Sequence, residues 1–328
     1  MKEKTLLISH IDLDGLGSYI LSSYFDLPFM NIHFANYSDY EDGSFPYEEL
    51  EKHEEVWYFD FTPDLKSQKI LEDNNITVII GDHHIEVKPE IDAWNYKNKT
   101  YIFDNDKSGT KIFYEYIKSY FSLPKNKVVE EFVELVNTYD LYSKQSPLWC
   151  KAQDLNRLLY KTASYFKPMP TKYEIFIASC IHKFTCLESF DFNKIEQKKI
   201  NEDKKKETEM FLEFVHGKRK IKTRKDDKGR YFSIIKLDSK ISAICNLLLE
   251  KYKKLDYIIA LNDYDPNSLK VSIRSKEHIN ILEYCNVKGH ENAAGMTEVT
   301  EDFFNDLWTG KIYALTPKEN SDIIKEQA

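Results

Sequence analysis

The first half of the chain alternates short apolar runs with stretches of helical periodicity, and this alternation constrains the fold more than any other feature. Short strands separated by helices are typical of parallel sheets, because parallel neighbours need a crossover connection. The sequence therefore predicts an α/β fold whose N-terminal domain is a doubly wound parallel sheet. The predicted strands are residues 5–9, 31–37, 56–59, 77–80 and 101–103, with helices expected at 63–72 and 109–121.

The second half predicts a helical region followed by a separate, smaller α/β domain. Residues 128–187 have a mainly helical pattern, and residues 195–215 form a highly charged segment typical of a solvated linker helix. We predict a catalytic domain at 1–190, a helical linker at 191–220 and a substrate-binding domain at 221–328. In the last domain, strands are expected at 231–237, 257–262 and 269–275, helices at 240–252 and 280–285, and turns at 217–220 and 226–229.

Composition excludes several classes of protein and partner. The chain has 328 residues, a formal net charge of −8 and no apolar run long enough to span a bilayer, so we expect a cytoplasmic protein without a membrane partner. Its five cysteines form no C-x-x-C pair, which favours reduced thiols over disulfides or a zinc knuckle. Because proteins that coat long nucleic acids are usually basic, we expect a short or small anionic substrate and no binding to long duplexes.

Polar side chains with metal-binding chemistry follow three of the predicted strands. His10, Asp12 and Asp14 alternate after the first strand, and alternate side chains of an extended segment share one face. Asp60 follows the third strand, and Asp82, His83 and His84 follow the fourth. Imidazole and carboxylate together suit Mn²⁺, Fe²⁺ or Zn²⁺, and carboxylate-rich sites favour Mn²⁺ or Mg²⁺.

Each of these residues, taken alone, has an ordinary structural explanation. An Asp after a strand can cap the next helix, adjacent histidines can lie on the surface, and Asp140 can simply end its helix. Taken together, carboxylates and imidazoles at the carboxyl ends of neighbouring parallel strands would meet in one crevice. Burying that many polar groups costs free energy unless a cation is present, so the pattern favours a two-metal centre.

In this order, the clusters at 10–15, 60, 82–84 and 140 resemble the four motifs of the DHH phosphoesterase superfamily. Residues 271–275 and 289–295 are similar to the serine-arginine strand and the glycine-histidine…alanine-alanine-glycine motif of the DHHA1 domain, and 107–110 resembles the small-residue turn after the fifth strand. The resemblance covers nearly the whole chain. One departure is that Val287 and Lys288 precede a single Gly289, where many relatives carry a longer glycine run.

The resemblance implies a role for each matching residue and two divalent cations as cofactors, with Mn²⁺ first and Mg²⁺ or Co²⁺ as alternatives. It implies one metal held by His10, Asp12 and Asp60, and a second held by Asp14, Asp60, His83 and Asp140. The catalytic and substrate-binding residues that it implies are Asp82 orienting a histidine, His84 on the substrate phosphate, Arg274 and His290 from the second domain, and Ser272, Gly289 and Asn292 as further contacts.

The function that the resemblance implies is hydrolysis of short RNA oligonucleotides to nucleoside monophosphates by an oligoribonuclease-like exonuclease. Phosphoadenosine phosphate and linear or cyclic dinucleotides are the alternative substrates, and long single-stranded DNA ranks third. The expected partners are therefore short single-stranded RNA or small nucleotides, and a homodimer is one option for the assembly. A different class of function, a non-catalytic nucleotide-binding protein, stays open on the same fold.

Overall fold

The computed structural model describes residues 3–27, 31–164, 167–226, 228–262, 270–283, 288–290 and 292–296. The chain divides into two compact units, Met1–Asn201 and Glu202–Ala328, and the boundary falls inside one long helix. Each unit has its own sheet and its own hydrophobic cores. Within the described residues, no helix combines the length and the apolar character needed to cross a membrane.

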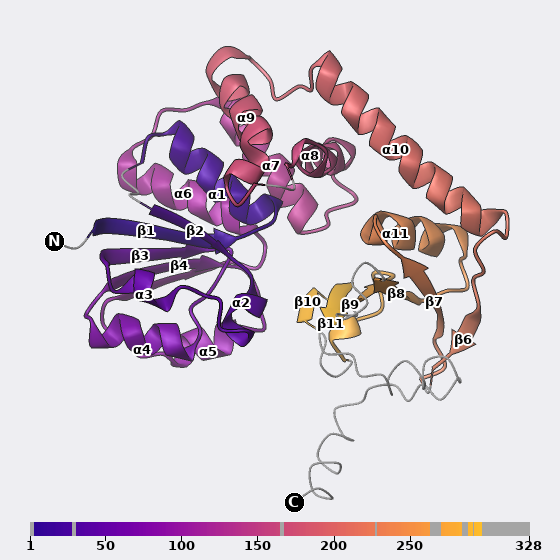
Figure 1. The fold of residues 1–328 in the computed structure, drawn as a ribbon, viewed down its shortest axis with the longest axis horizontal. Helices are drawn as coiled ribbons and strands as arrows, with labels where there is room; N and C mark the ends of the chain where they lie inside the picture. The colour runs from indigo at the N-terminus through magenta and orange to yellow at the C-terminus, as the bar shows by residue number, and fades with distance from the viewer. Residues whose placement is uncertain are drawn as a thin grey trace, which may run out of the picture. The chain divides into compact units, whose positions relative to one another are not determined.

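Unit 1 is built on a five-stranded sheet with the strand order β2-β1-β3-β4-β5 (Figure 1). All four neighbouring pairs run parallel. The register places Ile8 beside both His33 and Tyr58, in the middle of the sheet. The strands are β1 (Glu3–His10), β2 (Asn31–Ala35), β3 (His53–Phe59), β4 (Thr77–Asp82) and β5 (Lys99–Phe103).

Helices cover both faces of this sheet, because successive strand residues point to opposite sides. Leu7 and Trp57 pack into a core with α1, α6, α7, α8 and α9, whereas Leu6 and Val56 pack into a second core on the side of α3, α4 and α5 (Figure 1). The helices are α1 (Leu13–Tyr24), α2 (Tyr37–Glu41), α3 (Tyr47–Leu50), α4 (Leu65–Asp73), α5 (Lys88–Ala93), α6 (Gly109–Phe121), α7 (Lys127–Asp140), α8 (Trp149–Thr162), η1 (Thr171–Tyr173), α9 (Glu174–Cys186) and α10 (Lys194–Val215), the last of which continues into unit 2.

The strand order fixes where a ligand can bind in unit 1. The chain moves from β1 outward to β2 and then returns past β1 to β3, so the connections after β1 and β3 leave the sheet in opposite directions. Such a switch point opens a crevice at the carboxyl ends of the two strands. His10 ends β1 and Asp60 directly follows β3, so both residues lie at this crevice.

Unit 2 contains a six-stranded mixed sheet with the order β10-β11-β9-β8-β7-β6. Only β7 and β8 run parallel among its described pairs. Helix α11 packs Ile244 and Leu248 against Ile258, and a second core gathers Phe232 and Ile273. The elements are β6 (Thr223–Lys225), β7 (Tyr231–Leu237), α11 (Ile241–Lys251), β8 (Tyr257–Asn262), β9 (Lys270–Ser275), η2 (Ile281–Glu283), β10 (Lys288–His290) and β11 (Ala293–Met296).

The predicted parallel α/β sheet is confirmed, and two expected elements are corrected. The strand expected at 31–37 ends at Ala35, because the side chain of Asp39 accepts a hydrogen bond from the backbone of Asn36 and starts α2. The helix expected at 280–285 is a short 3₁₀ turn, in which the Asn280 side chain accepts from the backbone N–H of Leu282. Residues 284 and 285 lie outside the described residues. The hairpin of β10 and β11 was not predicted as a pair of strands.

A buried ion pair anchors the start of α10 on α9. Lys183 and Glu196 are 2% and 6% exposed, and the ammonium lies 2.7 and 2.8 Å from the two carboxylate oxygens. Glu196 also accepts from the backbone N–H of Asn193 at 2.8 Å. Burial opposes ionisation of Glu196, but these donors prevail and hold its pKa below the ordinary value of 4.5.

We expect Glu196→Gln to lower the free energy of unfolding by about 3 kcal/mol, because it leaves the Lys183 ammonium buried without a charge partner. Glu209→Gln on the same helix removes an exposed pair with Lys205 and should cost only about 0.3–0.5 kcal/mol. Urea unfolding measures both. The difference in the free energy of unfolding between wild type and Glu196→Gln should be largest above pH 4.5 and should shrink as the pH falls. The reason is that the lowered pKa of Glu196 reflects contacts that stabilise only its ionised form. Equal losses in both variants would contradict this account.

Candidate metal centre

The turn from β1 into α1 places three polar side chains at the sheet edge. Asp12 caps α1 and accepts hydrogen bonds from the backbone N–H groups of Asp14 and Gly15, each at 3.1 Å. Its other oxygen lies 3.0 Å from His10 Nδ1. A Cβ at Gly15 would come within 2.0 Å of the His10 carbonyl oxygen, so this tight turn requires glycine.

Asp60 lies at the centre of the site in an unusual backbone conformation. Its φ is +57°, in the left-handed region that non-glycine residues rarely adopt. The backbone N–H donates to the Gly81 carbonyl at 3.0 Å, and the residue is only 2% exposed. A Cβ at Gly109 would lie 2.4 Å from Asp60 Cβ, so glycine at the start of α6 makes room for Asp60.

His83 joins carboxylates that come from distant parts of the chain. Its Nε2 lies 3.3 Å from Asp60 Oδ1, 3.4 Å from Asp140 Oδ2 and 3.9 Å from Asp14 Oδ2. Asp140 is the last residue of α7, as the sequence indicated. The next residue, His84, pairs its Nδ1 with Asp82 Oδ1 at 2.9 Å. The two histidines therefore have different hydrogen-bond partners.

Asp14 is fixed by the N-terminus of α6. Its carboxylate accepts hydrogen bonds from the backbone N–H groups of Gly109 at 2.6 Å and Thr110 at 2.9 Å. The hydroxyl of Thr110 also donates to the Asp14 carbonyl. Helix N-termini favour negative charge, so α6 supports this carboxylate from behind. The small-residue turn at 107–110 was recognised in the sequence, but its contact with Asp14 was not predicted.

The carboxylates of Asp60 and Asp140 each have one oxygen that the described residues leave without a hydrogen bond. Burial and the charges of Asp14 and Asp12 raise the pKa of both Asp60 and Asp140 well above the ordinary range. Oδ2 of Asp60 and Oδ2 of Asp140 are buried with no hydrogen-bond partner among the described residues. Buried oxygens without partners are costly, and a bound cation would satisfy them.

The pKa values of the three histidines shift in two directions. Burial opposes the charged form of His10, but the charge and hydrogen bond of Asp12 prevail and raise its pKa. Burial likewise opposes the charge of His84, yet Asp82 prevails and raises the pKa of His84 to about 9. Burial and the neighbouring His84 instead lower the pKa of His83. A histidine that stays neutral can donate a nitrogen lone pair to a metal, which suits the position of His83 between carboxylates.

The donor atoms fall into three groups, each small enough to surround one ion. Within each group the atoms lie within 4.8 Å of one another. Their mixture of carboxylate oxygens and imidazole nitrogens fits divalent cations such as Mn²⁺, and the acidic and histidine cluster is consistent with such cofactors. The groups are His10, Asp12 and Asp60; Asp14, His83 and Asp140; and Asp60, Asp82, His83 and His84.

In unit 2, the predicted substrate-binding residues lie on adjoining strands. Arg274 of β9 is beside Ala293 of β11, which is in turn beside His290 of β10. Ser272 of β9 is opposite Gly295 of β11, and Gly289 of β10 is opposite Ala294 of β11. The side chain of His290 lies outside the described residues.

Two of these side chains have roles within unit 2 that the sequence did not indicate. The guanidinium of Arg274 donates to Ser242 Oγ at 2.7 and 3.2 Å, and to the Ile273 carbonyl at 2.8 Å. The amide nitrogen of Asn292 donates to Ser275 Oγ and to the carbonyls of Lys276 and Ile279. Arg274 is therefore held in one orientation, and Asn292 ties the loop after β9 to β11.

No model of a known protein family matches the chain. Over 88% of its length, and 91% of the relative's, it is 24% identical to a 3',5'-cyclic-nucleotide phosphodiesterase from Helicobacter pylori. Its fold matches that of a pGpG-specific phosphodiesterase, PggH from Vibrio cholerae, with a TM-score of 0.53 and 16% identity over 93% of this chain and 97% of the other. An uncharacterized protein from Helicobacter pylori G27 gives a TM-score of 0.48 and 19% identity over 94% and 97%. The two similar proteins above with a named activity are thus phosphodiesterases, and the DHH/DHHA1 resemblance itself stays a prediction.

We expect Asp60→Asn to raise the melting temperature of the chelated protein by a few degrees, because it removes a buried charge that like charges surround; about 1 kcal/mol corresponds to roughly 2–4 °C. Mn²⁺ should raise the melting temperature of wild type through preferential binding to the folded state, and this shift should largely disappear in Asp60→Asn. Differential scanning fluorimetry with and without Mn²⁺ measures both effects.

The matched control is Asp73→Asn, which removes an exposed carboxylate at the end of α4. It should keep the full Mn²⁺ shift and change stability by less than about 0.5 kcal/mol. If Asp60→Asn also kept the full shift, Asp60 would not be a metal ligand.

Proposed function

We propose that the chain is a metal-dependent phosphodiesterase that hydrolyses cyclic nucleotides or dinucleotides. The similarity to a 3',5'-cyclic-nucleotide phosphodiesterase and the fold shared with a pGpG-specific phosphodiesterase support this substrate class. The observation that carries the proposal is the convergence of His83 with Asp60 and Asp140, whose buried Oδ2 atoms accept no hydrogen bond within the described part of the chain. Such oxygens at the carboxyl edge of a parallel sheet suit cation-assisted chemistry on a phosphate.

The two oxygens of Asp60 face different donor groups. Oδ2 lies 3.9 Å from His10 Nδ1, whereas Oδ1 lies 3.3 Å from His83 Nε2. Asp60 can therefore serve one cation with His10 and Asp12, and another with Asp14, His83 and Asp140. Two divalent cations bound in this way would lower the pKa of a water molecule and stabilise negative charge on the phosphoryl oxygens.

His84 lies beside the proposed metal ligands, and we assign it to the substrate and not to a cation. Asp82 holds its Nδ1 edge, and Asp82 is itself fully buried, so the ring has a fixed orientation. Its Nε2 is then the atom to contact a non-bridging phosphate oxygen. A charge-assisted hydrogen bond from that atom would stabilise the charge that develops as the bond to the leaving oxygen breaks.

Arg274 is proposed to bind a phosphate of the same substrate. Its planar guanidinium can contact two phosphate oxygens at once, and Ser242 already fixes its orientation. Ser272, Gly289 and His290 lie on neighbouring positions of the same sheet and are proposed as further contacts. Close approach of a phosphate to backbone N–H groups needs a residue without a side chain, as Gly289 provides.

Hydrolysis of short RNA stays a prediction within this proposal. A linear dinucleotide is the shortest RNA, so the same site would cleave the phosphodiester bond of a dinucleotide and of a longer RNA. A non-catalytic nucleotide-binding role is disfavoured because that role has no need for several buried carboxylates that only a cation satisfies. Comparing substrates of increasing length separates these functions.

We expect the wild-type protein with Mn²⁺ to hydrolyse pGpG or a 3',5'-cyclic nucleotide, and Asp140→Asn to lower kcat by roughly 100-fold or more because it removes a proposed metal ligand. Glu134→Gln on the same helix removes a half-buried carboxylate that pairs with Lys111, away from the proposed ligands, and should leave kcat unchanged. Chromatography of the products, with 5'-labelled RNAs of two to twenty-four nucleotides in parallel and chelator as the blank, measures both. Absence of metal-dependent cleavage of every substrate would favour the binding-protein alternative.

We expect Arg274→Ala to raise KM by roughly 10-fold or more with a smaller change in kcat, because it removes a charged phosphate contact. Arg274→Lys should not restore KM, since an ammonium cannot make the same two-oxygen contact. Ser242→Ala, which only releases the guanidinium, should give an intermediate KM. Steady-state kinetics with pGpG measures all three, and an unchanged KM in Arg274→Ala would remove this residue from the substrate site.

A further inference from the structure

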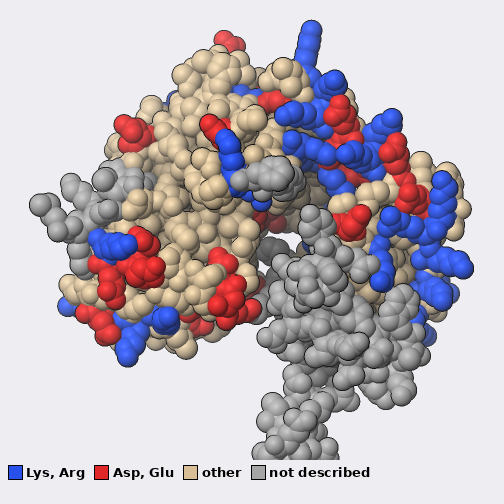
Figure 2. Space-filling view, viewed as in Figure 1, with Lys and Arg blue, Asp and Glu red and all other residues tan. Residues whose placement is uncertain are grey.

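The segment that follows α10 is the most basic stretch of an otherwise acidic chain. Residues 218–225 read Lys-Arg-Lys-Ile-Lys-Thr-Arg-Lys, so six of eight are cationic and none is acidic, whereas the whole chain has a formal charge of −8. Figure 2 shows Lys and Arg side chains gathered over α10 and the segment after it. Concentrating like charges in this way is unfavourable unless an anion offsets it.

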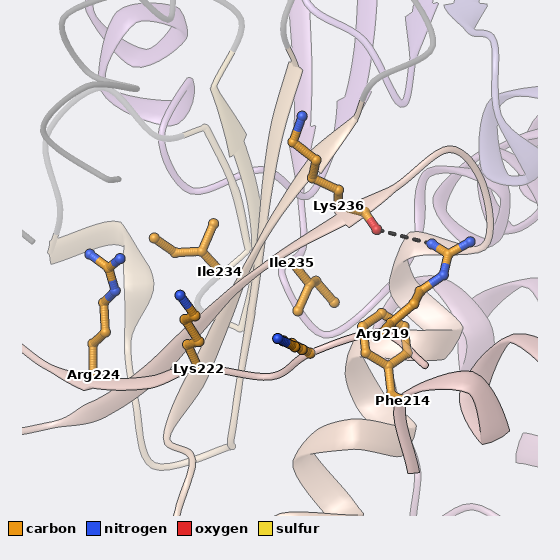
Figure 3. A pocket seen from close by; sticks show the side chains of 8 residues that line it. Phe214, Arg219, Lys222, Arg224, Ile234, Ile235 and Lys236 are labelled. Carbon is orange, nitrogen blue, oxygen red and sulfur yellow. Dashed lines mark hydrogen bonds between the residues drawn. The ribbon is translucent and has the colours of Figure 1, made fainter. Parts of the chain in front are cut away.

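Four of these six cations line a groove beside the sheet. β6 pairs with β7 only as far as Thr223 opposite Ser233. Beyond this pair, the residues before Thr223 and the residues after Ser233 are no longer paired as strands. A cavity of about 440 Å³ lies between these two segments. This volume lies within the usual range for ligand pockets. The lining residues are Phe214, Arg219, Lys220, Lys222, Arg224, Ile234, Ile235 and Lys236 (Figure 3).

The cations on one wall are arranged in a row. Lys220, Lys222 and Arg224 are alternate residues that all line the groove, Arg224 on β6 and the two lysines in the segment just before it. Figure 3 shows Lys222 and Arg224 pointing toward the same side of the segment. Lys220 and Lys222 are exposed, and within the described part of the chain neither forms an ion pair. Lys236 adds a cation from the opposite wall, on β7.

One end of the groove is closed by a fixed arginine. Arg219 Nε lies 2.7 Å from Glu213 Oε2, and Nη1 donates to the Lys236 carbonyl at 3.2 Å (Figure 3). The guanidinium also lies 5.8 Å from the centre of the Phe214 ring. Arg219 therefore bridges the two walls, while half-buried Ile234 and buried Ile235 offer an apolar surface between the rows of charge.

We propose that this groove binds the sugar-phosphate backbone of a single-stranded nucleic acid. A row of cations suits a chain of phosphates better than a single anion, which would need cations converging on one point. The apolar surface between the walls suits the sugars and bases. All lining residues belong to unit 2 and none is a proposed metal ligand, so the inference goes beyond the proposed function and requires no bound metal.

The test is fluorescence anisotropy with a 5'-fluorescein-labelled twelve-nucleotide oligouridylate in the presence of chelator, which prevents cleavage. We expect Lys220→Glu/Lys222→Glu to bind at least about 10-fold more weakly than wild type. The slope of log affinity against log salt should also become shallower by about 1.4, since each phosphate contact contributes about 0.7 for a single strand. Lys205→Glu/Lys206→Glu makes the same change of charge at exposed positions of α10 outside the groove and should bind within twofold of wild type.

Equal affinity of the groove variant and wild type would overturn the proposal, as would an equal loss in the α10 control. A labelled diuridylate should bind weakly to both proteins; the same fold loss as with the twelve-nucleotide strand would instead indicate a site for one phosphate. An octaglutamate peptide that competes as well as unlabelled oligouridylate would also overturn the assignment to nucleic acid. Mn²⁺-dependent hydrolysis of pGpG and the melting temperature, both unchanged in the groove variant, separate this result from misfolding and from a failure of the proposed catalytic function.

Discussion

The hydrogen bonds from α6 to the Asp14 carboxylate hold the carboxyl edge of the parallel sheet together. They join residues almost one hundred positions apart in sequence, and they are buried. The same helix start leaves Gly109 against Asp60, so one turn of backbone fixes two carboxylates at once. A helix N-terminus provides both hydrogen-bond donors and favourable potential for this purpose. The proximity of His83 and Asp140 to these carboxylates depends on this fixed geometry.

The site illustrates why a protein can keep an arrangement that weakens its own fold. Buried Asp60 and half-buried Asp140 lie among other acids, which opposes their ionisation and costs folding free energy at neutral pH. The strain of a left-handed backbone at Asp60 adds to this cost. A cation that bound to the folded state would offset such a cost and would couple ligand binding to stability.

The sequence allowed much of the first unit to be predicted, because strand alternation and the residues that end each strand are local signals. His10, Asp60 and His83 were placed at one edge because the carboxyl ends of parallel strands must lie together. The contact between α6 and Asp14 could not be derived in this way, since nothing local to either segment indicates its partner. The hairpin of β10 and β11 was missed because its strands are only three and four residues long. The side-chain bonds of Arg274 and Asn292 depend on packing that no periodicity encodes.

The early end of the pairing between β6 and β7 has a consequence for solubility. β6 covers only the first part of β7, so within the described residues the stretch from Ile234 onward lacks a strand partner on that side. Strand edges of this kind can pair with a second chain, and lysines are a common protection against such aggregation. Lys220, Lys222 and Lys236 surround this edge. Replacing them by alanine would remove mutual repulsion between copies, whereas replacing them by glutamate would preserve it, so the choice of substitution decides whether the altered protein stays dispersed at high concentration.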